Sequence, residues 1–325
     1  MKAQRGRWRG EEGGSRATIS SLSSVPDTQG TEVPSPPVSV IPLSILLLGD
    51  TNRPEFCEAR GCLTSCGVVT EFADVNAAAA ALTEDRLSPD VMVVAQAFPG
   101  EFSHQAIDRL RRLAPLARVV GLMGSWCEGE SRSGSPWPAT VRTYWHQWPA
   151  RCNRQLRHLT MGESCSWALP ATTTEEERLL ADASQHSGAA IPVCASESNG
   201  GRQECLPHQF QGLVAVRSRS REMADWLSAA CRSRGFVTLW QRDLALARVE
   251  GATAGVFDVG DFSDDDRESL HCFAAALRPA PVVALLSFPR IEDHRRALSA
   301  GATAVLSKPL MVEDLLESLC ALPVR

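Results

Sequence analysis

The stretch Gly301-Ala302-Thr303-Ala304-Val305-Leu306-Ser307-Lys308-Pro309-Leu310 decides how this chain of 325 residues is interpreted. A short apolar run leads directly into a Lys-Pro pair. Because a proline restricts the residue before it to extended backbone, Lys308 is predicted to end a β-strand. Open α/β sheets place their ligand sites at the carboxyl ends of such strands. The stretch therefore predicts the last strand of a parallel sheet, with Lys308 beside any site that the sheet carries.

Other apolar runs precede this stretch in the C-terminal part of the chain. Together with it they predict strands at residues 213–216, 236–240, 255–258, 282–287 and 304–307. Amphipathic segments between and after these runs have the spacing of helices. Strands that alternate with helices in this way indicate βα units and a parallel sheet.

The N-terminal half of the chain repeats this order of elements. Its apolar runs lie at residues 44–50, 68–72, 91–95, 118–123 and 141–145. The shared spacing of the runs, more than residue identity, predicts an internal duplication. The fold class that follows is α/β, with two tandem flavodoxin-like (βα)₅ domains, each built around a parallel sheet.

Composition sets the boundaries of these two lobes. Residues 1–40 are rich in Gly, Ser, Pro and Thr, so they are predicted to form a disordered tail. The first lobe is predicted at 41–159 and the second at 212–325. Residues 160–211 are predicted to be a linker that is helical in part.

Charge, hydropathy and cysteine usage exclude several classes of function. The chain has 33 Lys and Arg against 38 Asp and Glu, a net charge of −5, which argues against a nucleic-acid partner. No run approaches the ~18 apolar residues of a membrane span. The 11 cysteines form no CxxC pair and follow no secretory leader, so we expect reduced thiols, a cytoplasmic location and no metal site. No GxGxxG, P-loop or GxSxG motif indicates an enzyme.

Residues 124–148 form an unusual aromatic segment. Large aromatic residues and a nearby histidine with arginines could form a recognition surface for a protein, or could stack on a base or a sugar. The alternative is a loop whose aromatic side chains anchor it in the core. Cys127 with His146 also permits a nucleophile and base, although structural roles are favoured. The candidate binding residues are Trp126, Trp137, Tyr144, Trp145, His146 and Trp148.

The second lobe resembles the receiver domain of bacterial response regulators. The resemblance depends on Asp258 at the end of the third strand, Ser287 at the end of the fourth, and the Gly-Ala-x-x-x-Leu-x-Lys-Pro pattern that contains Lys308. It implies that Asp258 is the candidate phosphoacceptor for a histidine kinase. It also implies that Ser287 and Lys308 line the phosphorylation pocket, where the lysine would neutralise phosphoryl charge.

The second lobe departs from the receiver pattern at the end of its first strand. Receivers hold Mg²⁺ there with a pair of acidic residues, whereas this chain has Arg217 and Ser218. Because Mg²⁺ requires oxygen ligands, we expect phosphorylation to be lost and Mg²⁺ to bind only if Asp258 is phosphorylated. We also expect that Arg217 can pair with Asp258 and fill the site, and no other cofactor is predicted.

The first lobe departs further and resembles a pseudo-receiver. Ala95 stands at the phosphoacceptor position, Gly124 at the hydroxyl position and Trp148 at the lysine position, while Asp50 remains from the acidic pair. Alanine cannot accept a phosphoryl group, so no phosphorylation is expected in this lobe.

The predicted function is that of a non-enzymatic signalling or scaffold protein that acts through protein contacts. The resemblance points to residues 291–320 as the surface for an unidentified protein partner, and dimerisation is possible. One alternative is a phosphorelay receiver that is phosphorylated on Asp258. A second is a small-molecule binder or enzyme that uses the crevice at the strand carboxyl ends.

Overall fold

The computed structural model describes residues 42–321, apart from 85, 131–133, 139, 171, 175, 179, 182–210, 243–248 and 261. The predicted tail at 1–40 lies outside the described residues, and so does most of the predicted linker. The two lobes lie within one compact unit, Val40–Arg325. None of the helices in the described part of the chain has the length and apolar character that a membrane crossing requires.

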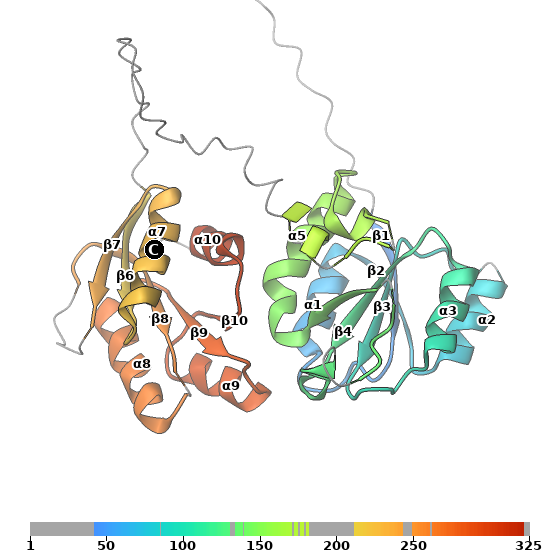
Figure 1. Ribbon diagram of the computed structural model, residues 1–325, viewed down its shortest axis with the longest axis horizontal. Helices are drawn as coiled ribbons and strands as arrows, with labels where there is room; N and C mark the ends of the chain where they lie inside the picture. The colour runs from blue at the N-terminus through green and yellow to red at the C-terminus, as the bar shows by residue number, and fades with distance from the viewer. Residues whose placement is uncertain are drawn as a thin grey trace, which may run out of the picture. The chain divides into compact units, whose positions relative to one another are not determined.

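The first lobe is a parallel five-stranded sheet in the order β2-β1-β3-β4-β5 (Figure 1). The strands are β1 (Leu43–Leu48), β2 (Gly67–Phe72), β3 (Val91–Gln96), β4 (Arg118–Met123) and β5 (Val141–Tyr144). The helices are α1 (Cys57–Cys66), α2 (Val75–Thr83), α3 (His104–Leu113) and α5 (Trp148–Thr160). Short 3₁₀ turns are η1 (Ser125–Cys127), η2 (Trp145–Gln147) and η3 (Ser166–Ala168).

Alternating strand residues form the two apolar faces of this sheet. Ile45 and Leu47 point to the face that α1 and α5 cover, and Leu46 and Leu48 point to the face that α2 and α3 cover. All four side chains are fully buried, which explains why the strand is a continuous apolar run. Helix α2 is capped by the Asp74 carboxylate, which accepts from the backbone N–H groups of Asn76 and Ala77.

The second lobe has a parallel five-stranded sheet with the order β10-β9-β8-β6-β7. Its strands are β6 (Gly212–Arg217), β7 (Phe236–Gln241), β8 (Ala252–Asp258), β9 (Val282–Ser287) and β10 (Ala304–Lys308). Helices α7 (Arg221–Ser233) and α10 (Val312–Ala321) cover one face, and α8 (Asp264–Leu277) and α9 (Ile291–Ser299) cover the other. The predicted fold class is confirmed: each lobe is a flavodoxin-like α/β layer structure.

Candidate functional site

The second lobe brings the predicted phosphorylation-pocket residues to one edge of its sheet. Strands β6, β8 and β10 end on Arg217, Asp258 and Lys308. Because the strands are parallel, their carboxyl ends meet at the same edge. Strand register also sets Lys308 opposite Ser287, the last residue of β9. The sequence pattern therefore located this edge correctly.

The carboxylate of Asp258 is held by two side chains. Lys308 Nζ lies 2.7 Å from Oδ1 of Asp258 and donates a second hydrogen bond of 2.9 Å to the Val259 carbonyl. Ser218 Oγ donates to Oδ2 of Asp258 at 2.7 Å. The side chains of Asp258 and Lys308 are only 11% and 18% exposed. Both carboxylate oxygens thus have a donor, and the negative charge has a cation beside it in a partly desolvated setting.

Ser218 is held in position for this contact by its neighbours. Its hydroxyl accepts from the backbone N–H of Ser220 at 3.1 Å, so its own hydrogen is left to donate to Asp258. The indole N–H of Trp240 donates to the Ser218 carbonyl at 3.2 Å. In the sequence, Ser218 stands where a receiver has an acidic residue. The sequence did not indicate that its hydroxyl would donate to Asp258.

Arg217 contacts the neighbouring edge strand. Its guanidinium donates to the Gln241 carbonyl at 3.2 Å. The Asp258 carboxylate is hydrogen-bonded by Ser218 and Lys308. The expected Arg217–Asp258 pair stays a prediction. Arg217 ends β6 beside the last residue of the edge strand β7, so its side chain reaches that strand's carbonyl.

Ser287 lies at the same edge but outside this contact network. Its side chain is exposed at the end of β9. The following Phe288 has a positive φ of 44° and is 60% exposed. A non-glycine residue in that conformation is uncommon, so the chain turns sharply after Ser287. Ser287 is not among the described residues that hydrogen-bond Asp258.

The donors at this edge are a poor match for Mg²⁺. No group of three His, Cys, Asp or Glu side chains able to hold a metal ion occurs in the described part of the chain. Among the described residues that end the strands of this sheet, Asp258 is the one carboxylate, and the Lys308 ammonium group engages one of its oxygens. Mg²⁺ requires a near-octahedral set of oxygen ligands.

The three acids that follow β8 do not complete that donor set. Asp264, Asp265 and Asp266 form the first turn of α8. Asp266 makes a reciprocal capping box with Ser263 and pairs with Arg219 at 3.0 Å. Asp264 pairs with Arg296 at 2.7 Å. The carboxylates of Asp264 and Asp266 are thus engaged by the helix end and by arginines.

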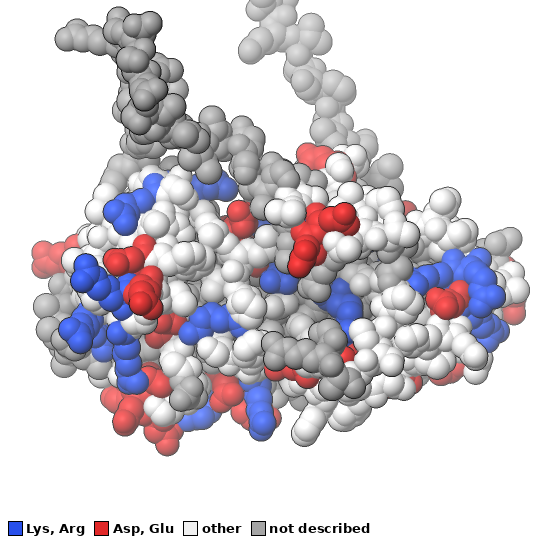
Figure 2. Space-filling view, viewed as in Figure 1, with Lys and Arg blue, Asp and Glu red and all other residues white. Residues whose placement is uncertain are grey.

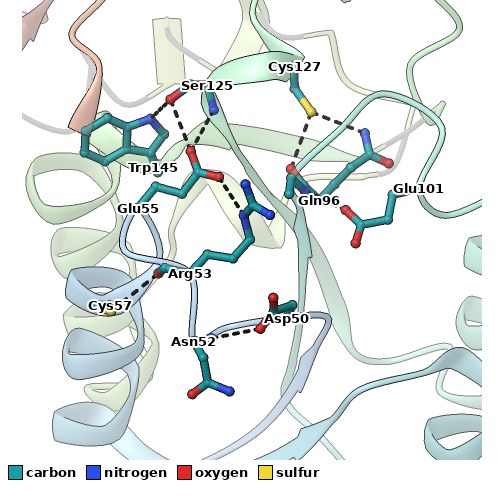
Figure 3. Close-up of polar contacts among 11 residues, drawn as sticks. Asp50, Asn52, Arg53, Glu55, Cys57, Gln96, Glu101, Ser125, Cys127 and Trp145 are labelled. Carbon is teal, nitrogen blue, oxygen red and sulfur yellow. Dashed lines mark hydrogen bonds and ion pairs between the residues drawn. The ribbon is translucent and has the colours of Figure 1, made fainter. Parts of the chain in front are cut away.

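The corresponding edge of the first lobe is filled by a different network (Figure 3). Ala95 is 1% exposed. The buried Glu55 carboxylate accepts from Ser125 N and Ser125 Oγ, both at 3.1 Å, and from Arg53 Nε at 3.1 Å. A Cβ atom on Gly124 would lie 2.9 Å from Glu55 Oε1. Glu55 and Ser125 thus form a hydrogen-bonded network beside Gly124, and both also line a pocket of about 590 Å³.

Strand register identifies a different residue at the lysine position of the first lobe. Thr143 lies opposite Leu122, as Leu306 lies opposite Leu285 in the second lobe. Two residues further along each chain come Trp145 and Lys308. Trp145 donates its indole N–H to Ser125 Oγ at 2.8 Å, within the network around Glu55. The sequence alignment of Trp148 with Lys308 was therefore wrong by three residues, because the 3₁₀ turn η2 separates the strand end from Trp148.

The aromatic segment forms mostly core. Trp137, Trp145 and Trp148 are 6%, 2% and 0% exposed, and Trp148 packs against Trp167 with a ring separation of 6.1 Å. These three tryptophans cannot form the exposed recognition surface that was one of the two predicted alternatives, because the core encloses them. Trp126 is 67% exposed and stacks on Phe98, with ring centroids 6.4 Å apart.

Cys127 and His146 do not form a nucleophile and base. Burial raises the pKa of the Cys127 thiol to about 11, and its sulfur lies against Gln96. His146 Nε2 is 2.9 Å from Glu128, and its ring stacks on Tyr144. A thiol with a raised pKa is a weak nucleophile at neutral pH. The structural roles favoured from the sequence hold for both residues.

The predicted partner surface at residues 291–320 contacts the first lobe. Arg154 Nη2 lies 3.0 Å from Asp314 Oδ1, and Arg154 Nη1 lies 3.2 Å from Glu317 Oε1. His146 Nδ1 lies 2.7 Å from Ser307 Oγ. The first lobe thus occupies part of the surface that the resemblance had assigned to an external partner.

Solved structures that are similar to this chain include response regulators and receiver domains. One from Burkholderia pseudomallei is 22% identical, covering 33% of this chain and 65% of that chain at a TM-score of 0.30. A CheY-like receiver domain protein from Methanospirillum hungatei JF-1 is 23% identical, with coverages of 33% and 90% and a TM-score of 0.29. A receiver domain of a histidine kinase from Clostridium thermocellum is 13% identical, with coverages of 35% and 100% and a TM-score of 0.31.

Each of these alignments covers about a third of the chain, and the identities speak to fold alone. No family model matches the sequence, and no curated protein matches it significantly.

Proposed function

We propose that this protein is a non-enzymatic signalling protein of the receiver type that acts through protein contacts. We further propose that phosphorylation on Asp258 has been lost. One observation carries this proposal: both oxygens of Asp258 are engaged, by Lys308 and by Ser218, where a receiver would have acids and a metal ion.

The charges at this edge explain why phosphoryl transfer would be slow. The reaction depends on positive charge placed around the transferring group, most of it from bound Mg²⁺. Lys308 supplies one cation, and it already neutralises the Asp258 carboxylate at 2.7 Å. Arg217 and Ser218 offer no carboxylate with which to recruit a divalent cation. The proposed result is a constitutive form of the fold, whose conformation does not depend on a phosphoryl group.

An exposed aromatic pair supports a role in protein contacts. Trp126 and Phe98 are 67% and 44% exposed, and the Arg53 guanidinium lies 4.9 Å from the centre of the Phe98 ring. Aromatic residues and arginine dominate binding hot spots. Elsewhere, acidic and basic side chains are intermixed over the face that Figure 2 presents.

Phosphorylation is tested by treating the full chain with acetyl phosphate and Mg²⁺ and measuring its intact mass. We expect no adduct on the natural sequence. The double variant Arg217→Asp/Ser218→Asp restores two acids beside Asp258 and should gain an adduct, because Mg²⁺ would then have three carboxylates. An adduct on the natural protein that Asp258→Asn removes would overturn the proposal.

The alternative of a working phosphorelay receiver keeps one observation in its favour. Lys308 stands 2.7 Å from the candidate nucleophile, which is where a phosphoryl group would need a cation. The same mass measurement separates the two functions, since this alternative requires the adduct without any restored acids.

The protein-contact role is tested separately. Trp126→Ala should reduce recovery of bound proteins in affinity capture. The matched control is Trp226→Ala, which removes a tryptophan that is 40% exposed on α7 of the second lobe. Equal recovery by the two folded variants would remove Trp126 from the proposed contact surface.

A further inference from the structure

A pocket of about 340 Å³ lies in the first lobe, at the edge of its sheet that is opposite the carboxyl ends of the strands. Arg118 and Val141 line it, and they are the first residues of the parallel strands β4 and β5. The pocket therefore sits at the amino ends of the strands. It is completed by the end of α3, by the loop after it, and by η3 with the segment that follows. It lies at the lower end of the size range of small-molecule sites.

Three arginines from separate segments line this pocket. They are Arg111 on α3, Arg118 on β4 and Arg178, which follows η3 in the chain. None of the described residues that line the pocket is acidic. Three guanidinium groups around one pocket, with no acid among its described lining residues, have the electrostatic character of an anion site.

Two of the arginines have backbone carbonyls among their hydrogen-bond partners. Arg111 Nη2 donates to the Pro138 carbonyl at 2.7 Å, and Arg111 Nη1 is 3.5 Å from Asp108, with which it forms an ion pair. Arg178 donates to the carbonyls of Ser166 and Pro170 at 2.6 and 2.8 Å. These contacts orient the guanidinium groups at the edge of the pocket. Burial also lowers the pKa of Arg111, which means that desolvation disfavours its charged form.

Arg118 is a second, independent sign of a missing ligand. Its Nε atom is buried and has no hydrogen-bond partner. A buried donor of a charged group is costly to leave unsatisfied. An oxyanion in the pocket would supply the acceptor, since a guanidinium offers two parallel donors that match phosphate or carboxylate oxygens.

From these observations we propose that the pocket formed by Arg111, Arg118 and Arg178 binds a small phosphate monoester. Three guanidinium groups suit a group that carries about −1.5 to −2 charges at neutral pH better than a singly charged carboxylate. The rest of the lining is apolar and includes the indole of Trp167, which is 5% exposed. The ester group would pack against this apolar side. This inference is independent of the proposed loss of phosphorylation on Asp258.

Binding can be measured by isothermal titration calorimetry of the full chain with phenyl phosphate. We expect saturable binding at one site that weakens as salt is raised. Inorganic phosphate lacks the apolar group, and benzoate lacks the second charge, so each should bind at least about fivefold more weakly. Equal affinity for benzoate would overturn the assignment to phosphate, and absence of saturable binding at millimolar concentration would overturn the site itself.

Variants assign the binding to this pocket. Arg118→Gln should weaken phenyl phosphate at least about tenfold, because a charge-assisted pair is lost. The matched control is Arg112→Gln, which lies next to Arg111 on α3, is exposed and does not line the pocket. If both variants bind like the natural protein, the proposal fails.

A further variant and a thermal measurement separate binding from a structural role. Leu116 lines the pocket and is 92% exposed, so Leu116→Ala should fold normally. It should weaken phenyl phosphate severalfold and leave inorganic phosphate unchanged. If the arginines served stability alone, phenyl phosphate would not raise the Tm of the natural protein, and that result would contradict the site even if Arg118→Gln does not fold.

Discussion

The carboxyl-end edges of the two sheets occupy the same place in the fold but have opposite character. In the second lobe, Asp258 and Lys308 form an ion pair that is partly exposed. In the first lobe the corresponding positions are Ala95 and Trp145, both nearly fully buried. A buried charge without its partner costs several kcal/mol, so a lysine without the aspartate would be unfavourable. One lobe therefore has both charged residues at these positions, and the other lobe has neither.

In the first lobe this edge is held by a network of hydrogen bonds. Trp145 reaches Ser125, and Ser125 binds the Glu55 carboxylate, so neighbouring segments are joined there. In the second lobe the same edge carries the Asp258–Lys308 charge pair, with Arg217 and Ser218 beside it. One lobe thus contributes core at this edge, whereas the other keeps a polar surface of defined geometry.

The largest expected effect concerns the tryptophans of the first lobe. Trp148→Ala should lower the free energy of unfolding by about 3–5 kcal/mol, because a fully buried indole leaves a cavity in the core. Chemical denaturation followed by circular dichroism measures this. Trp126→Ala is the matched control and should change stability by less than about 0.5 kcal/mol, since that side chain is exposed. Similar losses for both variants would contradict the assignment of this segment to the core.

A double-mutant cycle on Asp258 and Lys308 tests whether the charges belong together. Lys308→Met should cost about 2 kcal/mol, because Asp258 would be left with the Ser218 hydroxyl as its partner. The double variant Lys308→Met/Asp258→Asn should be more stable than the sum of the single effects predicts, by about 1 kcal/mol. Purely additive effects on the free energy of unfolding would show that the two charges do not depend on each other, which would contradict the comparison of the two lobes. The exposed Arg221–Asp225 pair offers a control, with an expected coupling below about 0.5 kcal/mol.

The smallest effect is a dependence of the free energy of unfolding on pH, which arises from the buried thiols Cys127 and Cys231. Burial raises the pKa values of Cys127 in the first lobe and Cys231 in the second to about 11, against 9.0 for an accessible thiol. The unfolded chain therefore releases these protons first as pH rises. Each thiol contributes stability below pH 9 that is lost as the pH approaches 11, about 1 kcal/mol by pH 10.

Denaturation at pH 8 and pH 10 checks this dependence. Other groups also titrate in this window, so Cys127→Ala and Cys231→Ala are compared with the natural protein. Each variant should lose less stability between the two pH values than the natural protein does. An unchanged loss in either variant would show that its thiol titrates normally in the folded state.

Much of the fold could be predicted because parallel strands buried on both faces are continuous apolar runs. Ile45 to Leu48 and Val282 to Leu286 stand out in the sequence for that reason, and Asp258 and Lys308 follow directly from where such runs end. The partners of those residues could not be predicted. Whether Arg217 or Ser218 meets Asp258 depends on which way each side chain points from the end of β6.

The sequence alone therefore predicts the parallel sheets, the duplication and the sheet edge that holds Asp258 and Lys308, because these features follow from the local hydrophobic pattern. Strand register and side-chain packing required the folded chain. They decided that Trp145 rather than Trp148 takes the first-lobe position that corresponds to Lys308, that three tryptophans lie in the core, and that Arg111, Arg118 and Arg178 meet around one pocket. Arg178 is distant in sequence from Arg111 and Arg118, and the folding of the chain brings it to the same pocket.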